Sequence, residues 1–222
     1  MRMLIFVGVL LAVTATVIVG LPRLSNAAGT GLGQSKNLQL MLVLDTTGSM
    51  QPVLDGARRD AAQLIEQLHR ETHGGELRIG LVAYRDYGEA YLTHQCPMDL
   101  PDRLLSCLSG LNTQGGGNVP EAVLEGLQRA SHHFTNSPLL GDKVIVLIGD
   151  APGHSESASA TASLVRHNAA RGIITHTVQW GGHNGTREQW QKLAMQGTGQ
   201  YVQLNSDQPE VGRIIAELIT TR

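Results

Sequence analysis

The strongest constraint on the fold of this chain is the alternation of short apolar segments with longer amphipathic ones. The segment 38–44 reads LQLMLVL, and the segment 144–148 reads VIVLI. Runs this short and this apolar are typical of strands buried on both faces of a parallel sheet. Residues 52–71, by contrast, repeat their apolar side chains at helical spacing. The alternation predicts an α/β fold with helices on both faces of a mostly parallel sheet.

The rest of the chain continues this alternation. The turn RDYG at 85–88 is too short for a parallel crossover, so the third strand should run antiparallel to the second. The prediction is therefore a doubly wound, Rossmann-like fold with a six-stranded sheet, parallel except for its third strand. Ligands of such folds bind beyond the carboxyl ends of the strands, where the strand order reverses. Further strands are expected at 77–84, 91–98, 173–180 and 201–204, and further helices at 101–108, from Pro120–Glu121 onward, and at 155–170, 187–196 and 209–220.

The first 27 residues have the features of an export signal. Arg2 precedes an apolar run at 4–21, and Ser25 and Ala27 place small residues before a cut after Ala27. The run is also close to the ~17–20 residues that span a bilayer, so an uncleaved membrane anchor stays open as an alternative. Either reading places the rest of the chain outside the cytoplasm, in the periplasm or secreted, with membrane contact only if the leader is uncleaved.

The glycine-rich segment 28–36 is expected to be a linker, and 37–222 a single domain. The linker resembles a phosphate loop only superficially, because it precedes the first strand and no GK[ST] closes it. We expect no small-molecule cofactor. The net charge of −2 and the lack of a run of like charges argue against nucleic acid as a partner.

Cys96 and Cys107 are the two cysteines of the chain. In an oxidising compartment an even number of cysteines favours a disulfide, so this pair is a candidate bridge. Two unpaired thiols are the alternative. The pair lacks the CxxC spacing of a zinc site.

Three loops at the ends of expected strands carry oxygen side chains. The first is DTTGSM, where Asp45, Thr47 and Ser49 alternate and can converge on one point. The second is GGGNVPE, which ends at Glu121. The third begins at Asp150, directly after the fourth strand.

Three carboxylates and two hydroxyls without a thiolate form a set of hard oxygen ligands. Such a set suits Mg²⁺, Mn²⁺ or Ca²⁺ and suits Zn²⁺ poorly. Without a metal, carboxylates gathered in one crevice repel each other and their pKa values rise. A bound cation removes that cost. The plain alternatives are an ordinary turn at 46–49, a helix N-terminus favoured by Glu121, and a cap at Asp150.

The motifs DTTGSM, GGGNVPEAV and VIVLIGDAP together resemble those of the von Willebrand factor A domain family, from about residue 38 to the C-terminus. Members of this family have a metal-ion-dependent adhesion site, with a D-x-[ST]-x-S loop after the first strand and an Asp after the fourth. The resemblance implies metal roles for Asp45, Thr47, Ser49 and Asp150.

The loop 115–121 departs from the commoner pattern of this family, which has a Thr there. It looks more like the D-x-P-E stretch of integrin β-subunit domains, which implies Glu121 as the remaining metal ligand. Asn118 is a weaker candidate for the rim of the site, because related sequences carry Asp there. His154 follows Asp150 closely and is a second candidate for the rim.

The resemblance implies an exported, bacterial-type binding module whose metal, Mg²⁺ or else Mn²⁺ or Ca²⁺, engages an Asp or Glu carboxylate of a protein partner. The alternative is an enzyme, a metal-assisted hydrolase or phosphoryl-transfer protein with His154 as base. We expect no enzyme, because the chain has no GxSxG, HExxH or phosphate-loop motif.

Overall fold

The computed structural model describes residues 35–117, 119–135, 137–181, 183, 185–205 and 209–221. The predicted leader at 1–27, almost all of the predicted linker at 28–36 and the rim candidate Asn118 lie outside the described residues.

The strands form one six-stranded sheet in the order β3-β2-β1-β4-β5-β6. Every neighbouring pair is parallel except β2 and β3, which are antiparallel. This confirms the predicted sheet, including the direction of its third strand. The strands are β1 (Leu38–Asp45), β2 (Leu77–Tyr84), β3 (Thr93–Asp99), β4 (Asp142–Gly149), β5 (Ile173–Trp180) and β6 (Thr198–Leu204).

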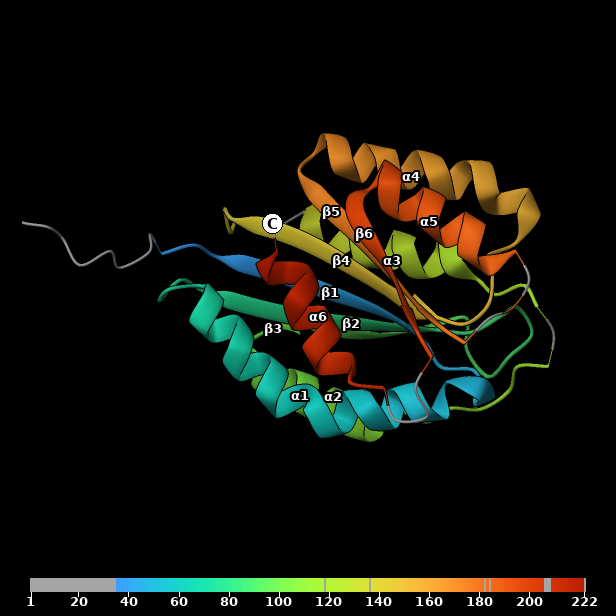
Figure 1. Ribbon diagram of the computed structural model, residues 1–222, viewed down its shortest axis with the longest axis horizontal. Helices are drawn as coiled ribbons and strands as arrows, with labels where there is room; N and C mark the ends of the chain where they lie inside the picture. Colours follow the sequence, from blue (N-terminus) through green and yellow to red (C-terminus); the bar gives the residue numbers. More distant parts are fainter. Residues whose placement is uncertain are drawn as a thin grey trace, which may run out of the picture. The chain divides into compact units, whose positions relative to one another are not determined.

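Helices cover both faces of the sheet. In Figure 1, α1, α2 and α6 lie on one face, and α3, α4 and α5 lie on the other. Short 3-10 turns at Gly48–Met50 and Ser155–Ser157 lead into α1 and α4. The helices are α1 (Gln51–Glu71), α2 (Asp102–Gly110), α3 (Val123–Thr135), α4 (Ala158–Ala170), α5 (Thr186–Gln196) and α6 (Val211–Thr220).

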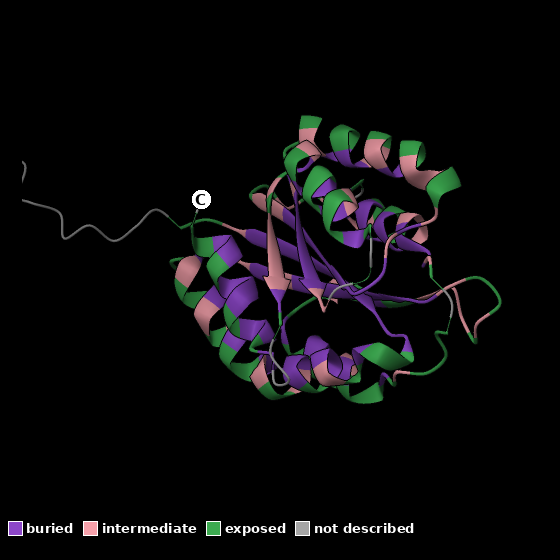
Figure 2. Ribbon diagram, turned by 45° about the vertical axis from the view of Figure 1, so that its right-hand side comes forward, coloured by how far each residue is buried: buried purple, intermediate pink, exposed green. Residues whose placement is uncertain are grey.

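The side chains of β1 divide between two hydrophobic cores. Leu40, Leu42 and Leu44 pack in the core beneath α1, α2 and α6. Met41 and Val43 pack in the second core, with residues of α3 and α5. Alternate residues of a strand point to opposite faces, and this explains why the whole segment is apolar. In Figure 2 the strands are mostly buried, and the helices are exposed on their outer sides.

The start of α3 differs from the prediction. The helix begins at Val123, and Glu121 instead forms an isolated parallel bridge with Gly153. The backbone N–H of Glu121 donates to Pro152 O at 2.9 Å, and that of Ala122 donates to Arg85 O at 3.3 Å. The prediction that Pro120–Glu121 open the helix was wrong, because the backbone of this segment is used to hold neighbouring loops.

A disulfide joins Cys96 of β3 to Cys107 of α2, so the predicted bridge is present. It ties the edge strand of the sheet to the short helix that follows it. Over the described ranges, no helix is both long enough and apolar enough to cross a membrane.

Candidate functional site

The candidate site lies where β1 and β4, neighbours in the middle of the sheet, both end. Leu44 pairs with Ile148, so Asp45 and Asp150 follow at the same edge of the sheet. The chain leaves β1 toward β2 on one side, and β4 leads to β5 on the other. The two carboxylates therefore sit at the point where the strand order reverses, which is the position expected for a ligand site in this class of fold.

The loop after β1 brings three predicted residues together. Thr47 has an extended backbone, with φ −65° and ψ 165°. Its backbone N–H and its hydroxyl both donate to Asp45 Oδ1, each at 2.8 Å. Its hydroxyl oxygen lies 3.3 Å from that of Ser49. Alternate residues in an extended segment share a side, which accounts for Asp45 and Thr47. Ser49 joins the row from the 3-10 turn Gly48–Met50, so the three side chains form one continuous row of oxygens.

The two residues between them are held by the loop that precedes Glu121. The carbonyl of Thr46 accepts from Gln114 N at 3.1 Å, and the N–H of Gly48 donates to Gly115 O at 3.0 Å. A Cβ on Gly48 would lie 2.9 Å from that same carbonyl oxygen. The close approach explains the glycine at this position. The two loops are thus joined directly by backbone hydrogen bonds.

Glu121 and Asp150 complete the set of predicted carboxylates. Glu121 is 2% exposed and Asp150 is 5% exposed. Both line one cavity of about 340 Å³, together with the hydroxyl residues Thr47 and Ser49. Four of the five predicted ligands thus border the same space, and the fifth, Asp45, is hydrogen-bonded to one of them.

The buried carboxyl groups are electrostatically unfavourable. Burial raises the pKa of Asp45 to about 7, the hydrogen bonds from Thr47 act against this rise, and the charge of Asp150 adds to it. Burial also raises the pKa of Glu121 to about 9, and the charges of Asp45, Asp86, Asp150 and Glu89 raise it further. A buried acid with a raised pKa is uncomfortable as an anion unless a cation lies beside it.

Two oxygens of this set fit a metal ion directly. Asp45 Oδ2 and Glu121 Oε2 are buried and have no hydrogen-bond partner among the described residues. Buried acceptors without partners are rare in folded proteins and call for an explanation. Within the described ranges, no three His, Cys, Asp or Glu side chains gather tightly enough to hold a metal by themselves. A metal at this place would therefore need the hydroxyls of Thr47 and Ser49 as well.

His154, predicted at the rim, faces a different neighbour. Its Nε2 lies 2.6 Å from Asp86 Oδ1, and its ring lies 5.1 Å from that of Tyr87. The residues that line the cavity do not include it. His183, for which no role was predicted, does line the cavity, and its Nε2 lies 3.8 Å from Asp150 Oδ2.

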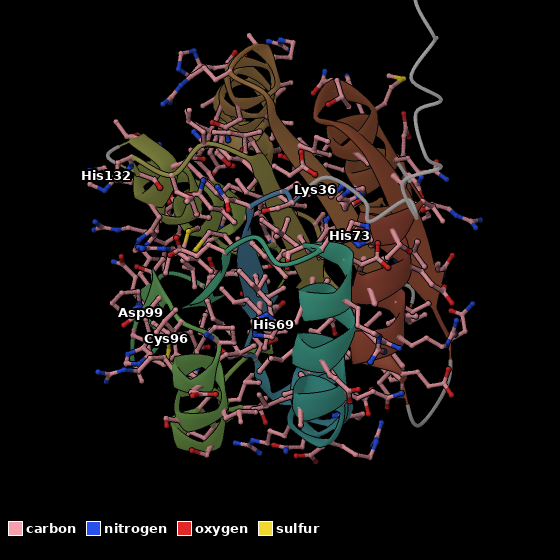
Figure 3. The ribbon with its side chains drawn as sticks, turned by 90° about the vertical axis from the view of Figure 1, so that its left-hand side faces the viewer. Lys36, His69, His73, Cys96, Asp99 and His132 are labelled. Atoms are coloured by element: carbon pink, nitrogen blue, oxygen red, sulfur yellow. A yellow bond between two sulfur atoms is a disulfide. The ribbon has the colours of Figure 1, made fainter. Side chains whose placement is uncertain are left out.

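His69 and His73 are four residues apart, a spacing that could suit a metal. They lie near the end of α1, as Figure 3 shows from the side at which β1 begins, and neither lines the candidate cavity. Cys96 of the disulfide is labelled in the same view. A second cavity of about 510 Å³ lies between α4 and α5, and its lining includes none of the five predicted ligands.

Two residues at the end of β2 belong to the site and were missed. Tyr84 is paired with Asp45 in the sheet, and its buried hydroxyl has no hydrogen-bond partner among the described residues. Burial raises its pKa, and the charges of Asp45, Glu121 and Asp150 raise it further. Arg85 is 1% exposed and donates to Thr46 O. The only sequence signal was their position at the end of a strand adjacent to β1.

The profile of the von Willebrand factor A domain family matches residues 39–208, which is most of the chain. The similarity extends to curated proteins. The chain is 31% identical over 134 residues to von Willebrand factor A domain-containing protein 7 of Homo sapiens, and 30% identical over the same length to that of Mus musculus. These alignments cover 60% of this chain and only 14% of the relatives' length.

Solved structures share the fold at lower identity. The pilus adhesin SpaC from Lactobacillus rhamnosus GG, in its open conformation, superposes with a TM-score of 0.64 at 14% identity, over 82% of this chain and 29% of that one. The conserved hypothetical protein BatB from Bacteroides thetaiotaomicron gives 0.58 at 19% identity, over 83% of this chain and 97% of that one.

Proposed function

The chain belongs to the von Willebrand factor A domain family, and we propose that it is a binding module that holds a protein partner through a divalent metal ion. The observation that carries the proposal is the pair of buried, unpartnered carboxylate oxygens, Asp45 Oδ2 and Glu121 Oε2. A cation is the partner that two such oxygens lack.

The residues that would hold the ion are Asp45, Thr47, Ser49, Glu121 and Asp150. Carboxylates and hydroxyls favour a hard ion, so we propose Mg²⁺ first and Mn²⁺ or Ca²⁺ as substitutes. The bound ion would supply a fixed positive charge and a coordination position for an oxygen from outside the chain. The side chain of Thr47 is already oriented to act as a metal ligand, because its N–H and hydroxyl both donate to Asp45 Oδ1.

The partner group that fits such a position is an Asp or Glu carboxylate. Attraction between the ion and an anion grows several-fold as water is excluded, and the ligand residues Glu121 and Asp150 are almost fully buried. The cavity also offers uncharged contacts beside the ion. Its lining includes the glycines 115–117 and Val119, a residue that is 51% exposed.

We propose that the module works outside the cytoplasm. The Cys96–Cys107 disulfide supports this location, because such bridges persist in oxidising compartments. The export signal predicted at 1–27 supports it as well.

A hydrolase or phosphoryl-transfer enzyme is the less supported alternative. Its candidate base, His154, has Nε2 directed to Asp86 at 2.6 Å. A histidine held in this way could act only after it turned toward the cavity. Hydrolysis of phosphoesters or carboxylic esters by the wild type, lost in Asp45→Ala, would favour the enzyme.

The test of the proposal is thermal melting of the full chain, stripped with EDTA and then supplied with Mg²⁺ or Mn²⁺. A ligand that binds only the folded state raises the melting temperature. We expect a rise for the wild type and none for Asp45→Ala. No rise in the wild type, or an equal rise in the variant, would contradict a metal at this site.

To find the partner, a protein mixture is passed over the immobilised chain, once in Mg²⁺ and once in EDTA, and the retained proteins are compared. We expect a protein that is retained only in Mg²⁺. The same protein should no longer be retained after its own Asp and Glu side chains have been amidated. Retention that is the same in EDTA would contradict the metal-dependent part of the proposal.

A further inference from the structure

Arg85 is the first residue after β2, and it is buried between the loops that carry the candidate ligands. Its side chain is among the largest that are fully buried in the protein, with 1% exposure. A buried arginine is expected to be paired or fully hydrogen-bonded, because its charge is costly to remove from water. The hydrogen-bond partners of Arg85 therefore indicate its structural role.

The guanidinium joins two loops of the site. Its Nε donates to Thr46 O at 3.1 Å, and its Nη2 donates to the carbonyl and to Oδ1 of Asn112, both at 2.9 Å. Thr46 lies between two candidate metal ligands. Asn112 begins the loop whose residues Gln114 and Gly115 bond back to Thr46 and Gly48.

Thr46 is held both at its backbone carbonyl and at its side-chain hydroxyl. The Arg85 guanidinium lies over the Tyr91 ring, 4.3 Å from its centroid. The Tyr91 hydroxyl lies 2.7 Å from Thr46 Oγ1. Arg85 thus holds the Thr46 carbonyl directly, and holds its hydroxyl through Tyr91. The planar fork of arginine makes these contacts together, which the single ammonium of lysine does not do.

The backbone of Arg85 reaches the third ligand-bearing segment. Its carbonyl accepts from Ala122 N at 3.3 Å, next to Glu121. Across the described ranges, no ion pair is found between Arg85 and a carboxylate, and its charge acts on Asp45 from a longer distance.

We propose that Arg85 is a positioning residue of the metal site, which fixes the loop of Asp45, Thr47 and Ser49 in its binding form before the ion arrives. This inference rests on the proposed function. Arginine offers only N–H donors and cannot itself bind the ion. It acts through Thr46, whose position determines where its two neighbours place their oxygens.

The test compares full-length Arg85→Lys and Tyr91→Phe with wild type. Mn²⁺ affinity is measured by calorimetry, and amide hydrogen exchange is measured in EDTA. Loss of a partner that orients metal ligands weakens metal binding by about 10–100-fold. We expect a loss of this size for Arg85→Lys and a smaller one for Tyr91→Phe. In EDTA, the amides of Thr47 and Gly48 should exchange faster, while those of 40–44 in β1 should not change.

Gln39→Leu is the matched control, because Gln39 of β1 is, like Arg85, a buried polar residue whose side chain holds a loop. Its Nε2 donates to Leu139 O at 2.9 Å, at the opposite end of the strand. We expect this variant to melt at a lower temperature and to keep the Mn²⁺ affinity of the wild type.

An Arg85→Lys chain that melts earlier, yet binds Mn²⁺ and exchanges its loop amides as wild type does, would overturn the inference. If Arg85→Lys does not fold, Tyr91→Phe and Asn112→Ala decide, and unchanged affinity and exchange in both overturn it. If wild type binds no Mn²⁺ while Arg85→Lys still loosens the loop in EDTA, the proposed function fails and the loop-fixing role of Arg85 stands.

Discussion

Oγ1 of Thr47 donates a 2.8 Å hydrogen bond to Oδ1 of Asp45, and the backbone N–H of the same threonine donates to the same oxygen. One oxygen of the Asp45 carboxyl is therefore satisfied twice, while the other, Oδ2, is buried without a partner among the described residues. This asymmetry fixes the orientation of the carboxyl, and Oδ2 is the oxygen that we propose binds a cation.

Replacing Asp45 with Asn should stabilise the metal-free chain and abolish its response to metal. Burial is the main reason that the pKa of Asp45 rises to about 7, so the ionised group opposes folding above that pH. An amide of the same shape has no charge to bury. Melting in EDTA at pH 8 should give a higher temperature for Asp45→Asn than for wild type, and addition of Mg²⁺ should not raise it further. A variant that melts lower in EDTA would contradict this.

The stability of the metal-free chain should fall as pH rises from about 4 to 9. In the folded state the pKa of Asp45 is about 7 and that of Glu121 about 9, both above their values of 3.8 and 4.5 in the absence of the fold. Across this range the folded state holds more protons than the unfolded state, so raising the pH favours unfolding. The stabilisation is complete below the unfolded values and is lost as pH passes the folded ones.

The measurement is the melting temperature in EDTA at pH 5 and pH 8, for wild type and for the double variant Asp45→Asn, Glu121→Gln. The wild type should lose more stability than the double variant between the two pH values. Mg²⁺ should raise the melting temperature of the wild type more at pH 8 than at pH 5, because metal binding needs the ionised carboxylates. Equal pH dependence of the two chains would show that these acids do not have raised pKa values.

Glu121→Gln should weaken Mn²⁺ binding by more than about 10-fold. Removing a residue that only orients a metal ligand costs about 10–100-fold in affinity, and removing a ligand should cost at least the lower end of that range. The reason is that Glu121 Oε2 is buried and unpartnered. Glu125→Gln, the same change four residues later in the first turn of α3, is the control and should leave the affinity as it is. Calorimetric titration of both variants measures the difference. Equal affinities would exclude Glu121 as a ligand.

Much of the fold follows from local sequence, because strands in the middle of a parallel sheet need apolar side chains on both faces. The bounds of β2 and β5 were predicted to the residue for this reason. The edge strand β6 was predicted too short, from 201, because its first residues Thr198, Gly199 and Gln200 are small or polar. An edge strand packs less of its surface, so its sequence is less constrained.

The site was predicted less completely than the fold. The alternation of Asp45, Thr47 and Ser49 is visible in the sequence, where an extended loop was expected to bring them to one side. The structure keeps the three oxygens in one row, although Ser49 lies in the 3-10 turn Gly48–Met50. Arg85 could not be identified in this way. Its role comes from the pairing of β1 with β2, which places it beside Thr46, 39 residues away along the chain. Glu121 was identified by family resemblance, and its place beside Gly153 depends on a bridge between distant segments.

Removal of the disulfide should lower stability and leave metal binding unchanged. Cys96 and Cys107 are 11 residues apart, and a loop of this size is worth roughly 3 kcal/mol in the chain-entropy account. Neither cysteine lines the candidate cavity. Urea unfolding of Cys96→Ser, Cys107→Ser should give a lower midpoint than wild type, with the same rise on addition of Mg²⁺. A lost response to Mg²⁺ would show that the bridge supports the site as well as the fold.

The central claim, a metal held by the loop after β1 with Glu121 and Asp150, is tested most directly by calorimetric titration of the EDTA-stripped full chain with Mn²⁺. We predict binding of one ion per chain in the wild type, no measurable binding in Asp45→Ala, and weakened binding in Ser49→Ala. A wild-type chain that binds no Mn²⁺, or an Asp45→Ala chain that binds it as wild type does, would contradict the account.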